Sequence, residues 1–152
     1  MKHDTRGLTL IELLTVISMI TITAAITAPS FAAIKRGAGL NNTAQEIVST
    51  LRVAQNKAIS SQRPVGNTAD PLDYGVYFDD TKYTLYYGDA ATVVEEHQLP
   101  DGTTVCDGPT DVRFNRLDGI PDSAKIVKVG IGCGGSTTRS ISVASSGTIQ
   151  SL

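Results

Sequence analysis

Residues 7–28 read GLTLIELLTVISMITITAAITA, an apolar stretch that follows a short polar head. Its length is close to the roughly 20 residues that an α-helix needs to cross a bilayer. Most of its polar side chains are Thr or Ser, whose hydroxyls can bond to a backbone carbonyl one turn back. Glu12 is the exception, because a carboxylate in hydrocarbon costs at least about 2.5 kcal/mol and needs a partner. The stretch therefore predicts a membrane helix with one functional carboxylate.

The run GLTLIELL, residues 7–14, resembles the processing motif of type IV pilins and of the pseudopilins of type II secretion. The resemblance implies that a prepilin peptidase cuts between Gly7 and Leu8 and that the new N-terminus is methylated. The family more often begins its mature chain with Phe, so Leu8 is a departure, whereas Glu12 matches the Glu at the fifth mature position. Pro29 matches a proline common in the family and should kink the helix, because it removes a backbone hydrogen bond.

The predicted cut also gives Glu12 a role in assembly. It would leave an α-ammonium on Leu8 at the membrane edge, where the Glu12 carboxylate of a neighbouring chain can pair with it. One alternative is a soluble helix with an exposed Glu. Another is an ordinary signal peptide cleaved near Ala24–Ala28, which the internal Glu12 and the length of the apolar run oppose.

The charges of the head set the expected orientation. Lys2 and Arg6 precede the apolar run, so this end is expected to stay in the cytoplasm and the C-terminal part to be exported. We expect a leader at 1–7, a transmembrane and assembly helix at 8–36 and an exported globular domain at 37–152. The expected location is the bacterial inner membrane, with a single span, and later a filament outside it.

An amphipathic helix is expected at about 40–63. Either it restarts at the capping box that begins with Thr43, after Gly37 and Gly39, or one long helix bends near the glycines. It should end near Arg63, because Pro64 disfavours helical geometry in the residue before it. The apolar stripe that would pack on a sheet is Leu40, Ala44, Ile47, Val48, Leu51, Ala54 and Ala58.

From Val65 onward the chain alternates short apolar runs with turn residues, which predicts an antiparallel sheet at about 74–150. The class is therefore α+β, with a long N-terminal helix packed on the sheet as in pilins. The expected strands are 74–78, 83–87, 93–99, 103–106, 112–115, 126–131, 140–144 and 148–150.

Few residues suggest chemistry. His3 and His97 lack partners at zinc spacing, and Glu95 and Glu96 would point to opposite faces of a strand. We expect neither an enzyme nor a cofactor or metal site. Cys106 and Cys133 lie in the exported part, where a disulfide is the expected state and two buried thiols the alternative.

Partners follow from charge and from a second resemblance. Val112-Arg113-Phe114 with Gly119, and Ile141–Val143 with Gly147 and Ile149, resemble the GspH/FimT-like branch of minor subunits. Some FimT-like minor pilins bind DNA through basic residues near the C-terminus, but the tail after Arg139 has no Lys or Arg. Since the net charge is also −2, nucleic acid is not an expected partner.

The sequence therefore predicts a structural subunit, minor rather than major, of a type IV pilus or a type II secretion pseudopilus. The implied partners are the prepilin peptidase, other pilin or pseudopilin subunits and the inner-membrane assembly platform. The alternative is a membrane-anchored or secreted β-rich binding module, such as an adhesin. Its support would be the tyrosines Tyr74, Tyr77, Tyr83, Tyr86 and Tyr87. Their alternation suggests that some of them face outward, but aromatic pairing across strands explains it equally well.

Overall fold

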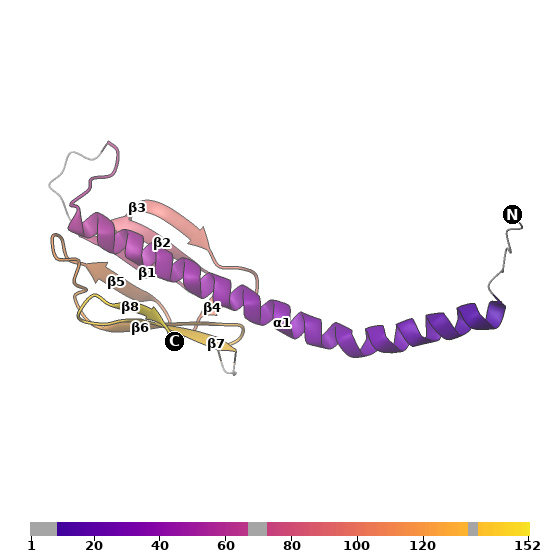
Figure 1. The fold of residues 1–152 in the computed structure, drawn as a ribbon. Coiled ribbons are helices and arrows are strands. Elements are labelled where there is room, and N and C mark those ends of the chain that lie inside the picture. The colour runs from indigo at the N-terminus through magenta and orange to yellow at the C-terminus, as the bar shows by residue number, and fades with distance from the viewer. Residues whose placement is uncertain (1–8, 67–72, 134–136) are drawn as a thin grey trace, which may run out of the picture. The chain divides into compact units, whose positions relative to one another are not determined.

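The computed structural model describes residues 9–66, 73–133 and 137–152. In these ranges one long helix, α1 (Leu10–Ile59), precedes eight strands (Figure 1). The chain divides into two compact units between Gly37 and Ala38, and α1 runs through that boundary. Within the described ranges, no helix combines the length and apolarity that crossing a membrane requires.

Helix α1 is continuous, so of the two expected arrangements the single long helix is the one observed. Thr43 does not cap a new helix, because its hydroxyl donates to the carbonyl of Gly39 one turn back, at 3.1 Å. The helix ends at Ile59, a few residues before the expected end. Ser61 takes a left-handed φ of 49° there, and the N–H of Gln62 bonds to the carbonyl of Lys57, which together form a Schellman cap.

The second half of α1 supplies the core of the domain, as its apolar stripe predicted. All seven stripe residues are buried, and Ile47, Leu51, Ala54 and Ala58 are fully so. The opposite face, which includes Gln45, Ser49, Arg52 and Asn56, is exposed. Figure 1 shows this part of α1 lying along the strands, whose inward side chains complete the same hydrophobic cluster.

The strands form two antiparallel sheets, where the sequence predicted one. The α+β class is confirmed and each predicted strand exists, with ends that shift by a few residues. The first sheet has the order β3-β2-β1-β5 and the second the order β4-β6-β7-β8. The strands are β1 (Tyr74–Phe78), β2 (Lys82–Tyr87), β3 (Asp89–Gln98), β4 (Thr104–Val105), β5 (Thr110–Phe114), β6 (Lys125–Gly130), β7 (Thr138–Val143) and β8 (Ile149–Ser151).

The side chain of Gln55, on α1, holds two loops of the strand region in place. The amide nitrogen of Gln55 donates to the carbonyl of Gly119, at 3.0 Å, and to that of Gly147, at 2.9 Å. Gly119 precedes β6, and Gly147 lies in the turn between β7 and β8. Neither glycine has room for a side chain, because a Cβ at Gly119 would strike Ile59 and a Cβ at Gly147 would strike Gln55.

Candidate functional site

The first turns of α1 carry a dense set of exposed apolar side chains. Such a surface is unfavourable in water. Large contiguous apolar patches usually mark contacts with another protein or with a membrane. Ten large apolar residues between Leu10 and Ile26 are exposed, from 47% at Val16 to 80% at Leu10. They are Leu10, Ile11, Leu13, Leu14, Val16, Ile17, Met19, Ile20, Ile22 and Ile26.

The hydroxyls in this segment bond to its own backbone, as the sequence predicted. Thr15 donates to the carbonyl of Glu12 at 2.9 Å, and Ser18 donates to that of Leu14 at 2.7 Å. Thr21 and Thr23 make the same kind of bond, at 2.9 and 3.0 Å. Since these hydroxyls need no external partner, they leave the segment compatible with an apolar surrounding.

Thr9 has a role that the sequence interpretation missed. Its hydroxyl oxygen accepts a hydrogen bond from the N–H of Glu12 at 3.3 Å, and its carbonyl accepts the first helical bond from Leu13. Thr9 is therefore the N-cap, and Thr9-Leu10-Ile11-Glu12 has the spacing of a capping box. That spacing was visible in the sequence. It places the Glu12 carboxylate in the first turn, where the helix dipole favours negative charge.

Other predicted site residues are less fully described. Gly7 and Leu8, the predicted processing residues, lie outside the described residues. Pro29 lies within the continuous helical backbone, its side chain is outside what the structure describes, and the kink stays a prediction. Glu12 is exposed, and its pairing with another chain also stays a prediction.

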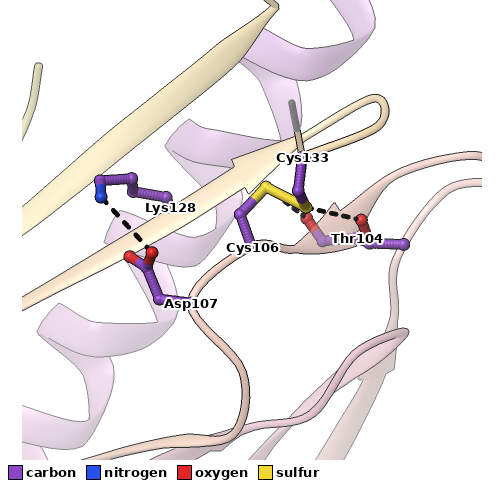
Figure 2. Close-up of a disulfide and its surroundings, with 5 residues drawn as sticks. All are labelled: Thr104, Cys106, Asp107, Lys128 and Cys133. Atoms are coloured by element: carbon purple, nitrogen blue, oxygen red, sulfur yellow. Dashed lines mark hydrogen bonds and ion pairs between the residues drawn. A yellow bond between two sulfur atoms is a disulfide. The ribbon is translucent and has the colours of Figure 1, made fainter. Parts of the chain in front are cut away.

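Cys106 and Cys133 form a disulfide with a Cα–Cα distance of 5.1 Å (Figure 2). It joins the end of β4 to the segment after β6. A Cβ at the adjacent Gly130 would first strike the side chain of Thr138, at 2.8 Å, and the carbonyl of Thr137, at 3.0 Å. Beside it, Lys128 and Asp107 form an exposed ion pair at 3.4 Å. A disulfide fits an exported domain.

The tyrosines do not form an outward binding surface, so this support for the alternative function was wrong. Tyr74, Tyr83, Tyr86 and Tyr87 are at most 1% exposed, and only Tyr77 is half-buried. Tyr74, Tyr83 and Tyr87 belong to the hydrophobic core, where the rings of Tyr74 and Tyr87 lie 5.0 Å apart. Aromatic pairing across strands explains their alternation.

Tyr86 is buried on the face of the first sheet away from the core cluster. Its ring covers Gly75, its hydroxyl donates to Asp111 at 2.7 Å, and Arg113 donates to that hydroxyl at 3.3 Å. Burial raises the pKa of Tyr86 to about 12, against the opposing hydrogen bond from Arg113. The phenol therefore stays neutral at ordinary pH and acts as a structural donor.

His97 lies in β3 and is partly buried. Its side chain is 24% exposed, and its ring stacks on Tyr83 with centroids 4.9 Å apart. Its two ring nitrogens face Glu46 of α1 at 3.5 Å and Glu95 at 3.2 Å. Glu96 faces the other way and pairs with Lys82 at 2.9 Å, as adjacent strand residues should. Nowhere in the described ranges do three or more His, Cys, Asp or Glu side chains gather to hold a metal ion.

These features can be compared with known proteins. Residues 43–147 match the family described as type II transport protein GspH. The chain belongs to this GspH family. None of the curated proteins compared with it matches.

Two solved structures are similar in fold, both of the type IV minor pilin FimU from Pseudomonas aeruginosa strain PAO1. One is 16% identical, with a TM-score of 0.54, over 73% of this chain and 86% of FimU. The other is 15% identical, with a TM-score of 0.55, over 74% of this chain and 92% of FimU. At this identity the likeness concerns the fold, which is that of a minor pilin. The predicted resemblance to the GspH/FimT-like branch is thereby confirmed.

Proposed function

We propose that this chain is a minor structural subunit of a type IV pilus or a type II secretion pseudopilus, that it is not an enzyme, and that it assembles through the first half of α1. The observation that carries the proposal is the exposed apolar surface of Leu10–Ile26, whose hydroxyls bond internally and which contains one carboxylate, Glu12. A helix with this surface needs lipid or other helices around it.

In the proposed cycle, residues 8–36 anchor the precursor as a single span in the inner membrane, with the domain at 37–152 exported. Prepilin peptidase removes residues 1–7, and Leu8 is methylated. The assembly platform then extracts the subunit, and its helix packs against those of other subunits. The new ammonium of Leu8 pairs with Glu12 of a neighbour, which offsets the cost of burying both charges.

The first test is the N-terminal sequence and intact mass of the protein purified from its native membrane. The expected result is a chain that begins at Leu8 and carries one added methyl group. A start beyond Ala24 would indicate an ordinary signal peptide, and an intact Met1 would leave a simple anchor. Either of these results would contradict the proposal.

The second test replaces Glu12. Glu12→Gln keeps the size of the side chain but removes its charge, so we expect normal membrane insertion and at least a tenfold loss of the subunit from sheared filaments. Asp101→Asn, which removes one charge from an exposed loop of the domain, is the matched control and should assemble normally. Equal incorporation of both variants would refute the role of Glu12.

A further inference from the structure

Strand β3 forms a free edge of the first sheet (Figure 1). It stands at the end of the order β3-β2-β1-β5, so within the described ranges only β2 pairs with its backbone. With ten residues it is longer than the usual strand of about five or six. Its outer edge therefore offers unpaired N–H and C=O groups, to which an extended segment of another chain can add as a further strand.

A groove lies between this edge strand and α1, and we call it the α1–β3 groove. It has a volume of about 230 Å³. Glu95 and His97 of β3 lie opposite Leu85 and Tyr83, which are core residues, so both project from the face of the sheet that α1 covers. A strand added to the free edge would place every second side chain over the same groove. The lining residues are Glu46, Ser49, Thr50, Val53, Glu95 and His97.

The α1–β3 groove carries uncompensated negative charge. His97 lies between two carboxylates, with its Nδ1 3.5 Å from Glu46 and its Nε2 3.2 Å from Glu95. One imidazole holds at most one positive charge, so the three side chains keep a net negative charge while both carboxylates are ionised. No Lys or Arg of the described ranges forms an ion pair with Glu46 or Glu95. Both side chains are 57% exposed, so a cation from another molecule can reach them.

Tyr83 adds a buried hydroxyl that lacks a hydrogen bond. The residue is 1% exposed, and its hydroxyl makes no hydrogen bond to any described residue. Glu46 and Thr50, the side chains beside this hydroxyl, both line the groove. Burial raises the pKa of Tyr83, and the neighbouring Glu46 raises it further, so the phenol stays neutral. Since an unsatisfied buried polar group is costly, a donor that enters the groove would be stabilised there.

We propose that an extended, basic segment of a different protein pairs with the free edge of β3 and inserts an arginine side chain into the α1–β3 groove. The planar guanidinium has five N–H donors, which suit two carboxylates and the oxygen of Tyr83 better than the compact ammonium of lysine does. A second copy of this chain is a poor partner, because two β3 edges would bring like charges at Glu95 and Glu96 together.

The proposal goes beyond the proposed function and does not depend on it. Every residue of the groove belongs to the compact unit that begins at Ala38, and the first half of α1 takes no part. Recognition of this kind divides the work between two features. The strand pairing supplies affinity that depends little on sequence, and the groove supplies specificity for one basic side chain.

The test measures binding of a synthetic peptide to the full chain, purified in an uncharged detergent, by fluorescence anisotropy. The peptide alternates threonine and valine and has one arginine at its centre. In the matched control peptide, citrulline replaces the arginine and keeps its shape without its charge. We expect the arginine peptide to bind with a Kd below about 1 mM and the citrulline peptide to bind at least about tenfold more weakly. The arginine peptide with every backbone nitrogen methylated should not bind, because it cannot pair with β3.

Two substitutions in β3 separate the groove from the rest of the strand. Glu95→Gln removes one charge from the groove, so the arginine peptide should bind at least about fivefold more weakly. Glu96→Gln removes the same charge from the opposite face, where Glu96 pairs with Lys82, and should change binding by less than about twofold. Both residues are exposed, so neither variant should lower the melting temperature by more than a few degrees.

Three results would overturn the proposal. They are no binding of the arginine peptide at about 1 mM, equal binding of the citrulline or the methylated peptide, and equal weakening by the two glutamine variants. The processing test at Leu8 involves none of these residues, so such a failure leaves the proposed function standing.

Discussion

At the scale of a single residue, Gln55 fixes two loops near the end of α1. Its side-chain amide donates to two carbonyls, of Gly119 and Gly147, that lie 64 and 92 residues away along the chain. A carboxylate cannot donate to either carbonyl. Gln55→Glu, which keeps the shape, should therefore cost about 2 kcal/mol of the free energy of unfolding, or roughly 4–8 °C in melting temperature.

The matched control is Gln45→Glu, which adds the same charge to the exposed face of the same helix. It should change the free energy of unfolding by no more than about 0.5 kcal/mol. Thermal unfolding of both variants, followed by circular dichroism, makes the comparison. If the two variants melt together, Gln55 does not hold the loops in the way its contacts indicate.

At the scale of the elements, the packing of Tyr86 over Gly75 links three strands of the first sheet. Gly75 of β1 pairs with Tyr86 of β2 and with Arg113 of β5, and the ring lies where a Cβ of residue 75 would be. Gly75→Ala must displace the ring and break its hydrogen bond with Asp111. We expect a loss of about 1–3 kcal/mol in urea unfolding, as is usual for overpacked sites.

A double-mutant cycle identifies the cause of that loss. In a Tyr86→Ala background the ring is gone, so Gly75→Ala should cost much less than it does alone, a coupling of at least about 1 kcal/mol. The same penalty in both backgrounds would mean that the backbone conformation of Gly75, and not the ring, sets the cost.

At the scale of the whole molecule, local patterns predicted much of the fold. The three- and four-residue spacing of the α1 stripe predicted its buried face, and turn residues such as Asp79 and Gly147 marked the strand ends. The end of the helix was harder to predict, because its left-handed cap position holds Ser61 where a glycine is usual.

Other features depend on contacts that single-sequence patterns do not encode. The strands separate into two sheets because pairing partners are chosen in three dimensions, and β5 pairs with β1 instead of with β4. Tyr86 alternates like an outward residue, yet the missing side chain of Gly75 lets it lie flat and become buried. In the candidate site, the sequence alone identified Glu12, because a carboxylate in an apolar run is costly to bury. The cap at Thr9 could also have been predicted, from the capping-box spacing of Thr9 and Glu12. Elsewhere in the domain, Leu117 has a left-handed φ of 79° that no sequence pattern indicated, because it follows from contacts of its loop such as the bond from its N–H to the carbonyl of Ala58.

The Cys106–Cys133 disulfide concerns the whole molecule, since it ties the two-residue strand β4 to the β6–β7 connection across 27 residues of sequence. Replacing both cysteines by serine should lower the free energy of unfolding by about 3–4 kcal/mol, because the unfolded chain regains the entropy that the closed loop removed. The free energy of unfolding should also fall more steeply with urea concentration, since a chain without the cross-link exposes more surface on unfolding.

Lys128→Ala is the control for the disulfide, because it breaks only the adjacent exposed ion pair, which contributes at most about 1 kcal/mol. Equal stability of the serine variant and the native chain would show that contacts of Val105 in the core, and not the disulfide, hold this edge of the second sheet.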